Sequence, residues 1–236
     1  MRLDKLLANM GYGSRKEVKQ LLKKGAVRVN GETVKDPACK VEPTADEVTI
    51  LGERVVYREF IYLMMNKPQG VISATEDLRD RTVIDLLDAE YKHFQPFPVG
   101  RLDKDTEGFL LLTNDGKLAH ELLSPKKEVP KMYYAHIEGK VGEEDIRKFA
   151  EGVTLDDGYF TKPGELKVLK SEELRSEIEL TITEGKFHQV KRMFEAVGKR
   201  VIYLKRMSMG PLILDDQLKL GSYRELTEEE IALLQK

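Results

Sequence analysis

The chain has 236 residues, of which 34% are charged and 41% hydrophobic, and its 39 basic and 41 acidic side chains leave a formal net charge of −2. This composition is typical of a folded globular protein that can bury a core without disulfides or metal ions. The single cysteine, Cys39, excludes an intrachain disulfide and favours a reducing compartment, which we take to be the cytoplasm. Four scattered histidines predict no metal site, and no segment is apolar enough for a membrane helix.

The positive charge is concentrated near the N-terminus. Residues 1–41 carry a net charge of +6, and the remainder of the chain carries −8. A small basic segment ahead of an acidic body favours an anionic partner such as nucleic acid. A solvated, lysine-rich helix face would give the same composition, so charge alone leaves both interpretations open.

The first predicted elements are two short helices and a β-hairpin. Four apolar residues recur at the spacing of one helix face, namely Leu3, Leu6, Leu7 and Met10. Ser14 followed by Glu17 predicts a capping box at the start of the second helix, which Gly25 ends. The turn Asn30-Gly31 between alternating valines predicts the hairpin.

This order of elements resembles the S4 RNA-binding domain, with Ser14-Arg15 at the start of the second helix and Asn30-Gly31 in the turn. The resemblance implies a domain over residues 1–58 that binds structured RNA. Its expected RNA-binding residues are Arg2, Arg15, Lys16 and Lys19. Contacts of this kind to phosphates position an RNA without reading its sequence.

The body, residues 59–236, combines strands and helices without regular β-α-β alternation. Strands are predicted over residues 60–65, 109–112, 131–138 and 177–183, and helices over residues 82–87, 117–123, 143–151 and 188–197. This order favours an α+β domain with a largely antiparallel mixed sheet.

A polar loop bounded by glycines precedes the apolar strand over residues 109–112 and holds Arg101 and Asp103. A rigid strand with a charged loop at its end can carry a catalytic carboxylate, although an ordinary Asp- and Gly-rich loop would look similar. A phosphatase-like interpretation of Asp103-Lys104-Asp105-Thr106 is disfavoured, because Gly100 and Arg101 interrupt the apolar run that such a motif follows.

Three motifs in this body resemble those of the pseudouridine synthases. Residues 100–116 (GRLDKDTEGFLLLTNDG) depart from the family signature only at Phe109, residues 131–133 (KMY) match the second motif, and residues 184–193 (EGKFHQVKRM) match the third. The segments HQVKRMFEAVG and RELTEEEIA are most similar to the RsuA branch, the synthases of small-subunit (16S) rRNA.

The resemblance implies that the chain isomerises a specific uridine of 16S rRNA to pseudouridine. Asp103 would be the catalytic carboxylate, Lys191 the cation that keeps it ionised, and Tyr133 the ring that stacks on the flipped uracil. Because substrate and product are isomers, no cofactor or metal ion is expected.

The same resemblance gives weaker expectations for three other residues. Arg101 is expected to contact the RNA backbone or fill the space that the base vacates, and Lys67 is expected to line the RNA cleft. His188 is not expected to act as a general base, because the family pattern does not use it in that way.

Two alternatives remain open at this stage. A large-subunit (23S) rRNA synthase would share all three motifs, and a non-catalytic S4-type ribosome assembly factor would share the N-terminal domain. The expected partner is rRNA or a small-subunit assembly intermediate, bound by a monomeric protein in the cytoplasm with no membrane association.

Overall fold

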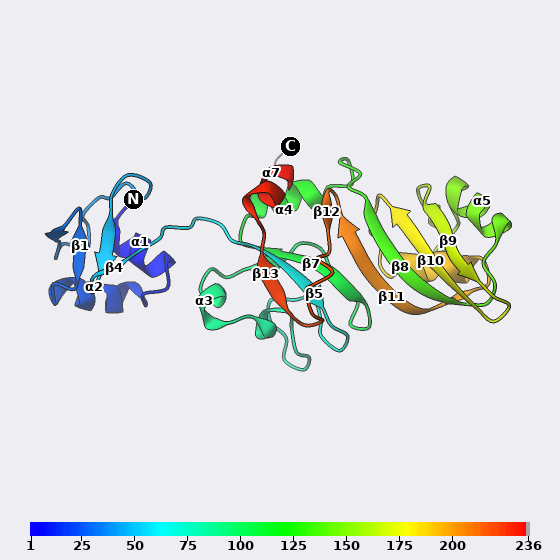
Figure 1. Cartoon of the computed structure of the whole chain (residues 1–236), viewed down its shortest axis with the longest axis horizontal. Coiled ribbons are helices and arrows are strands. Elements are labelled where there is room, and N and C mark those ends of the chain that lie inside the picture. The colour runs from blue at the N-terminus through cyan, green and yellow to red at the C-terminus, as the bar shows by residue number, and fades with distance from the viewer. Residues whose placement is uncertain (235–236) are drawn as a thin grey trace. The chain divides into compact units, whose positions relative to one another are not determined.

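A computed structural model of the protein describes residues 1–234 and divides the chain into two compact units (Figure 1). The first unit comprises Met1–Ile61 and Leu87–Pro96, and the second comprises Tyr62–Leu86 and Phe97–Lys236. We keep a domain boundary after residue 58 as a proposal. The last two residues of the proposed second domain, 235–236, lie outside the described residues.

The first unit packs helices against a four-stranded antiparallel sheet. Its elements are α1 (Leu3–Asn9), α2 (Arg15–Lys23), β1 (Val27–Val29), β2 (Glu32–Thr33), β3 (Val48–Ile50), β4 (Glu53–Arg54) and α3 (Ala89–Lys92), and the strand order is β2-β1-β3-β4. The apolar faces of α1 and α2 form its core with β1 and β3. The predicted capping box is confirmed, because the Glu17 amide donates to Ser14 Oγ and the Ser14 amide donates to the Glu17 carboxylate.

The second unit is built on one nine-stranded sheet. Its strands are β5 (Tyr62–Lys67), β6 (Phe97–Pro98), β7 (Glu107–Thr113), β8 (Lys131–Glu138), β9 (Glu165–Ser171), β10 (Arg175–Ile182), β11 (Arg200–Met209), β12 (Leu212–Ile213) and β13 (Tyr223–Glu225). The main order is β13-β5-β7-β11-β8-β10-β9, with β6 paired to β7 and β12 to β11. Only the β7–β11 pairing is parallel among the described strands. The predicted α+β fold with a largely antiparallel mixed sheet is therefore confirmed.

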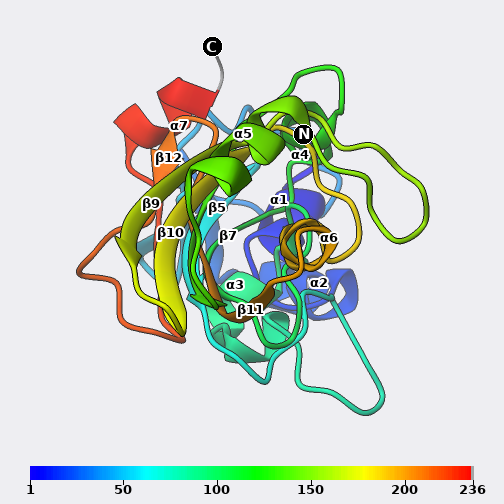
Figure 2. The same cartoon turned by 90° about the vertical axis from the view of Figure 1, so that its right-hand side faces the viewer.

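The helices of the second unit are η1, a single 3₁₀ turn (Ile84–Leu86), α4 (Gly116–Leu123), α5 (Glu143–Glu151), α6 (Gln189–Ala196) and α7 (Glu228–Leu234). Asp115 caps α4 by accepting the amides of Lys117 and Leu118 at 3.1 and 3.0 Å. Helix α6 lies on the concave side of the curved strands β8 to β11 (Figure 2). No helix within residues 1–234 is both long and apolar enough to cross a membrane.

Several predicted elements have shifted bounds in the structure, and two of these differences have a clear structural cause. The strand expected over residues 60–65 begins later and continues to Lys67, because its backbone pairs with β7 as far as Gly108. The helix expected over residues 82–87 is reduced to η1, since Thr82 forms a β-bridge with Ile72 and stays extended. The first shift brings Lys67 inside the sheet, beside the loop that carries Asp103.

Candidate active site

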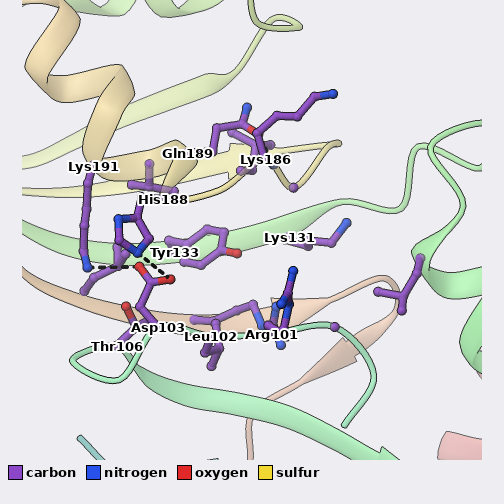
Figure 3. Close-up of a pocket in the computed structure, with 17 residues that line it drawn as sticks. Arg101, Leu102, Asp103, Thr106, Lys131, Tyr133, Lys186, His188, Gln189 and Lys191 are labelled. Atoms are coloured by element: carbon purple, nitrogen blue, oxygen red, sulfur yellow. Dashed lines mark hydrogen bonds and ion pairs between the residues drawn. The ribbon is translucent and has the colours of Figure 1, made fainter. Parts of the chain in front are cut away.

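The second unit contains a cavity of about 120 Å³ that brings together four of the predicted site residues, Arg101, Asp103, Tyr133 and Lys191 (Figure 3). Its walls come from the loop before β7, from β8, from the start of α6 and from β11. Five of its lining side chains are basic, namely Arg101, Lys131, Lys186, Lys191 and Arg206, whereas Asp103 is the one acidic residue of the lining. A cavity with this balance suits an anionic ligand and places a single carboxylate beside it.

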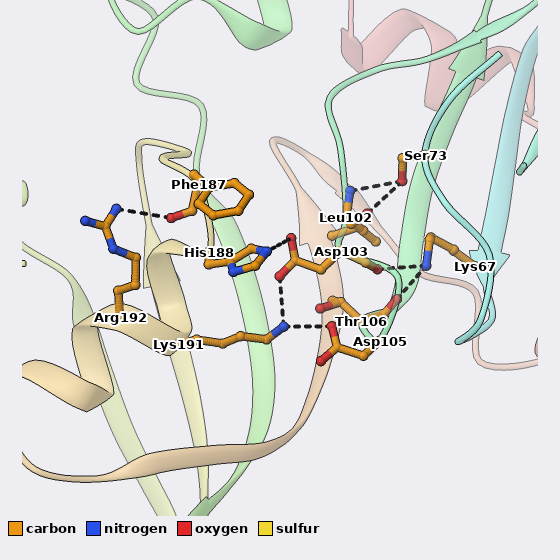
Figure 4. Close-up of polar contacts among 10 residues, drawn as sticks. All are labelled: Lys67, Ser73, Leu102, Asp103, Asp105, Thr106, Phe187, His188, Lys191 and Arg192. Carbon is orange, nitrogen blue, oxygen red and sulfur yellow. Dashed lines mark hydrogen bonds and ion pairs between the residues drawn. The ribbon is translucent and has the colours of Figure 1, made fainter. Parts of the chain in front are cut away.

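Hydrogen bonds to backbone atoms just before and just after Asp103 hold the loop that carries it (Figure 4). Ser73 Oγ accepts a hydrogen bond from the Leu102 amide and donates one to the Leu102 carbonyl, both at 3.0 Å. The Gly70 amide donates to the Lys104 carbonyl at 2.8 Å. These contacts fix the position of Asp103 through the fold, so its carboxylate is placed before any ligand binds.

Lys67 supports the same loop from inside the protein. Its ammonium donates to the carbonyls of Pro68, Asp103 and Thr106 at 3.0, 3.0 and 2.9 Å, and its side chain has no exposed surface. Burial lowers the pKa of Lys67 to about 8, against the opposing charges of Asp103 and Asp105. The expectation that Lys67 lines the RNA cleft is therefore wrong, because its amine faces backbone carbonyls at the end of a buried strand.

Lys191 forms the predicted ion pair with Asp103. Its Nζ lies 3.0 Å from Asp103 Oδ2 and 2.7 Å from Asp105 Oδ1. Burial by itself would lower the pKa of Lys191, but the hydrogen bonds and charges of Asp105 and Asp103 outweigh burial and raise it. Lys191 is therefore a fixed positive charge at the carboxylate, and Asp105 is a second partner that sequence reasoning did not assign.

His188 is a second residue at the carboxylate that sequence reasoning did not place there. It precedes α6 in the left-handed conformation, with φ near 50°, and its Nε2 lies 3.5 Å from Asp103 Oδ1. Its ring stacks on that of Phe187 with centroids 3.8 Å apart, and Phe187 is 74% exposed. A left-handed non-glycine residue costs of order 1 kcal/mol and occurs preferentially at functional sites. No periodicity or spacing in the sequence signals this conformation.

The opposite wall of the cavity is formed by β8 and β11. Tyr133 on β8 is 8% exposed and lies across from Arg206 on β11 in the strand register. Tyr133 thus presents its ring within the cavity between Asp103 and Lys131 (Figure 3). An aromatic ring in such a place can stack on a base that has left its helix.

Four basic residues of the first unit were predicted to bind RNA, and they lie on helix α2 and near the N-terminus. Arg15, Lys16 and Lys19 are exposed on α2, and Arg2 is exposed and paired with Asp4 at 3.0 Å. Their role in RNA binding stays a prediction. Within residues 1–234, no group of three or more His, Cys, Asp or Glu side chains is placed to hold a metal ion.

Comparison with known proteins gives matches over both units. The pattern of the RNA pseudouridylate synthase family matches residues 61–196, and that of the S4 domain matches residues 1–48. The chain is 61% identical over 234 residues to an uncharacterized RNA pseudouridine synthase of Bacillus subtilis, covering 99% of this chain and 98% of the relative.

Relatives that are named for the small or the large ribosomal subunit have nearly equal sequence identity to this chain. Identity is 42% over 236 residues with ribosomal small subunit pseudouridine synthase A of Yersinia pestis, covering 98% and 97% of the two chains. It is 41% over 237 residues with ribosomal large subunit pseudouridine synthase B of Bacillus subtilis, covering 99% and 95%. The crystal structure of a pseudouridylate synthase superposes over 99% of both chains, with 36% identity and a TM-score of 0.69.

Proposed function

The chain belongs to the RNA pseudouridine synthase family and is an isomerase, and from that premise we propose that Asp103 is the carboxylate with which it converts one uridine of 16S rRNA into pseudouridine. The observation that carries this proposal is the geometry of the cavity. A carboxylate lies on a backbone-fixed loop, paired with Lys191 at 3.0 Å, in a cavity whose other charged lining residues are all basic.

The reaction sets the requirements that these residues meet. Uridine loses its N1–C1′ bond and gains a C5–C1′ bond, while the proton on C5 is replaced and N1 gains one, so atoms balance without an oxidant or co-reactant. An ionised carboxylate can attack the substrate or stabilise positive charge that develops on the ribose. The detached uracil must turn in place, and the walls of the cavity, from the Asp103 loop, β8, β11 and the start of α6, limit its escape.

Each neighbouring side chain has a proposed role in that sequence. Lys191 stabilises the negative charge of Asp103 next to the phosphates of the RNA. Tyr133 stacks on the flipped uracil and takes part in proton transfer. Arg101, exposed at the edge of the cavity, contacts the RNA backbone or fills the space that the base leaves.

The proposed partner is 16S rRNA, free or in a small-subunit assembly intermediate, bound by a monomer in the cytoplasm. Support comes from the third-motif and C-terminal segments, which are most similar to the small-subunit branch. Overall identity with named relatives does not separate the two subunits, since 42% and 41% are equivalent. The large-subunit alternative is therefore kept as an outcome of the test.

The test is to map pseudouridines in rRNA from cells that lack this gene and from the same cells complemented with the wild-type chain or Asp103→Asn. We expect one pseudouridine to disappear from 16S rRNA and to return only with the wild-type chain. Loss of a 23S pseudouridine instead would establish the alternative substrate. No change in either rRNA, or restoration by Asp103→Asn, would overturn the proposal.

A purely structural role in ribosome assembly is the less supported alternative. It would not require the Asp103–Lys191 pair or the backbone contacts that hold the loop. Complementation with Asp103→Asn separates the two functions, because assembly defects that this variant corrects do not depend on catalysis.

A further inference from the structure

Two buried cations share one face of the sheet at the cavity. Lys131 on β8 is 8% exposed and Arg206 on β11 is 2% exposed. Lys131 and Tyr133 are two residues apart on β8, and Arg206 lies directly across from Tyr133, so strand alternation puts the three side chains on the same face. All three line the cavity that contains Asp103.

The protein satisfies these two cations only in part. Lys131 Nζ donates to the Val129 carbonyl at 2.8 Å, and Arg206 Nε donates to the Phe109 carbonyl at 2.9 Å. Arg206 Nη2 is buried without a hydrogen-bond partner. Within residues 1–234, neither side chain forms an ion pair, although Asp103 stands in the same cavity paired with Lys191.

An arrangement of this kind is unfavourable in the free protein. A buried donor without a partner costs about 1–3 kcal/mol, and more if it is charged. Burial, together with the neighbouring charge of Arg206, lowers the pKa of Lys131 to about 8. Two buried like charges, neither of them paired with a carboxylate in the described residues, favour the binding of an anion between them.

We propose that Lys131 and Arg206 form a phosphate subsite, which holds a backbone phosphate next to the target uridine while the base lies against Tyr133 and Asp103. This inference rests on the proposed function for the identity of the ligand. Lys131 lies on the other side of Tyr133 from Lys191 (Figure 3), so a phosphate bound to Lys131 is kept apart from the reacting carboxylate. Lys131 and Arg206 thus orient the nucleotide, while Lys191 pairs with the Asp103 carboxylate.

The charge of the site favours a phosphate over an edge of the base. Guanidinium and ammonium groups are donors only, and both bind phosphate oxygens with charge-assisted hydrogen bonds. A uracil carbonyl could accept one of these hydrogen bonds, but it is neutral and would leave both charges uncompensated. A phosphodiester supplies the acceptors and the negative charge together.

The first test uses inorganic phosphate and the full-length chain, and it does not depend on any RNA substrate. Dissociation constants come from the rise in Tm as phosphate replaces chloride at equal ionic strength. We expect Lys131→Met and Arg206→Gln to weaken phosphate binding at least tenfold, and Lys131→Arg to retain it. Lys205→Met is the matched control, because it removes the same charge from the adjacent residue of β11, which faces the other side of the sheet.

Equal phosphate binding by the wild-type chain, Lys131→Met and Arg206→Gln would overturn the subsite. Lys131→Met replaces a buried charge with an apolar side chain of similar length, so it should fold even if Arg206→Gln does not. If phosphate binding depends on Lys131 while the cells of the mapping experiment keep all their rRNA pseudouridines, the proposed function fails and the anion site stands.

The second test places the phosphate within the RNA. Short RNAs with one neutral methylphosphonate are compared with the unmodified RNA, the neutral linkage lying 5′ of the target uridine, 3′ of it, or three nucleotides away. In Asp103→Asn, which we expect to bind RNA without turnover, one adjacent neutral linkage should weaken binding about tenfold. In Asp103→Asn/Lys131→Met that penalty should fall below about twofold. If the neutral linkage weakens binding by Asp103→Asn/Lys131→Met as much as by Asp103→Asn, the phosphate role is contradicted. It is also contradicted if Lys131→Met changes the response to replacing uracil with cytosine but not the response to the neutral linkage.

Discussion

At the scale of single residues, the candidate site separates side chains that hold the loop from side chains that face the cavity. Lys67 and Ser73 bind backbone atoms around Asp103, whereas Lys191 and His188 approach its carboxylate. The first group should determine stability and the second group should determine chemistry. Substitutions in the first group are therefore expected to lower the free energy of unfolding, and substitutions in the second group to lower the reaction rate.

Lys67→Met tests the supporting group. Three backbone carbonyls would lose their donor in a place that water does not reach, so we expect the free energy of unfolding to fall by about 3 kcal/mol or more. Denaturant unfolding measures this loss. Lys104→Met is the control, since its amine makes a half-exposed ion pair with Asp80 and should cost less than about 1 kcal/mol. Equal losses would show that Lys67 is not a support.

Lys131 gives the protein a distinctive pH dependence. Its pKa is about 8 in the folded protein, lowered by burial, against an ordinary value of 10.5. Between these values the unfolded chain holds a proton that the folded chain has lost, so stability rises with pH. From pH 7 to 9.5 we expect Lys131 to contribute a rise of about 2 kcal/mol in the free energy of unfolding. Lys67, whose pKa burial also lowers to about 8, adds a rise of its own in both proteins. In phosphate-free buffer, the stability of Lys131→Met should therefore rise by about 2 kcal/mol less than that of the wild-type chain, and parallel curves for both proteins would refute the contribution of Lys131.

Sequence reasoning identified part of the site because its residues occur in motifs. Asp103, Tyr133 and Lys191 belong to three segments far apart in the chain, and the structure brings them to one cavity. Lys67 was misplaced because the predicted strand ended at residue 65, whereas β5 continues to Lys67 and buries its side chain. His188 was missed for a different reason, since a left-handed backbone before a helix leaves no periodic trace.

At the scale of elements, prediction succeeded where local pattern and capping agree. Strand β8 and helix α5 have the bounds expected from sequence, 131–138 and 143–151, because one alternates strictly and the other has an apolar face and an acidic first turn. Strand β11 was not predicted. Its burial does not alternate cleanly, its register with β8 is broken twice, and its partners come from distant parts of the chain. The parallel pairing that brings Arg206 beside β7 could therefore not be foreseen.

Gly108 is the point where that parallel pairing is closest. It pairs with Arg206, its φ is +103°, and a Cβ there would lie 2.2 Å from the Arg206 carbonyl oxygen. Because the obstacle is backbone, we expect Gly108→Ala to destabilise the protein by more than about 3 kcal/mol. Gly116→Ala is the matched control, since nothing lies within 4 Å of its Cβ position at the start of α4. The midpoints of denaturant unfolding compare the two, and a small effect of Gly108→Ala would show that β7 and β11 can separate.

At the scale of the whole molecule, charge is divided between the two units. The basic residues near the N-terminus are exposed on α2, while the second unit contains the cavity and the carboxylate. This division predicts that the first unit supplies much of the affinity for RNA and the second unit supplies the chemistry. Salt dependence distinguishes the two contributions, because each phosphate contact releases counterions.

A triple variant, Arg15→Ala with Lys16→Ala and Lys19→Ala, tests the contribution of α2. We expect its RNA affinity to fall, and the log–log dependence of affinity on salt to become shallower by roughly 2–3 units, since each of the three lost contacts accounts for about 0.7–0.9. The control replaces three exposed lysines of the second unit, Lys140, Lys167 and Lys170, with alanine. Equal salt dependence in the triple variant and the wild-type chain would remove α2 from RNA binding.

The most direct test of the central claim follows the hydrogen on C5 of uridine, which is released when the new C5–C1′ bond forms. The measurement compares tritium release from RNA labelled at C5 by the wild-type chain, Asp103→Asn and Asp105→Asn. Asp103→Asn should bind the RNA normally and release label at least about a thousandfold more slowly, a barrier increase of roughly 4 kcal/mol. Asp105→Asn, which loses the same charge but keeps the Asp103–Lys191 pair, should stay within about tenfold of the wild-type rate. Release by Asp103→Asn within about tenfold of the wild-type rate would contradict the assignment of Asp103 as the catalytic carboxylate.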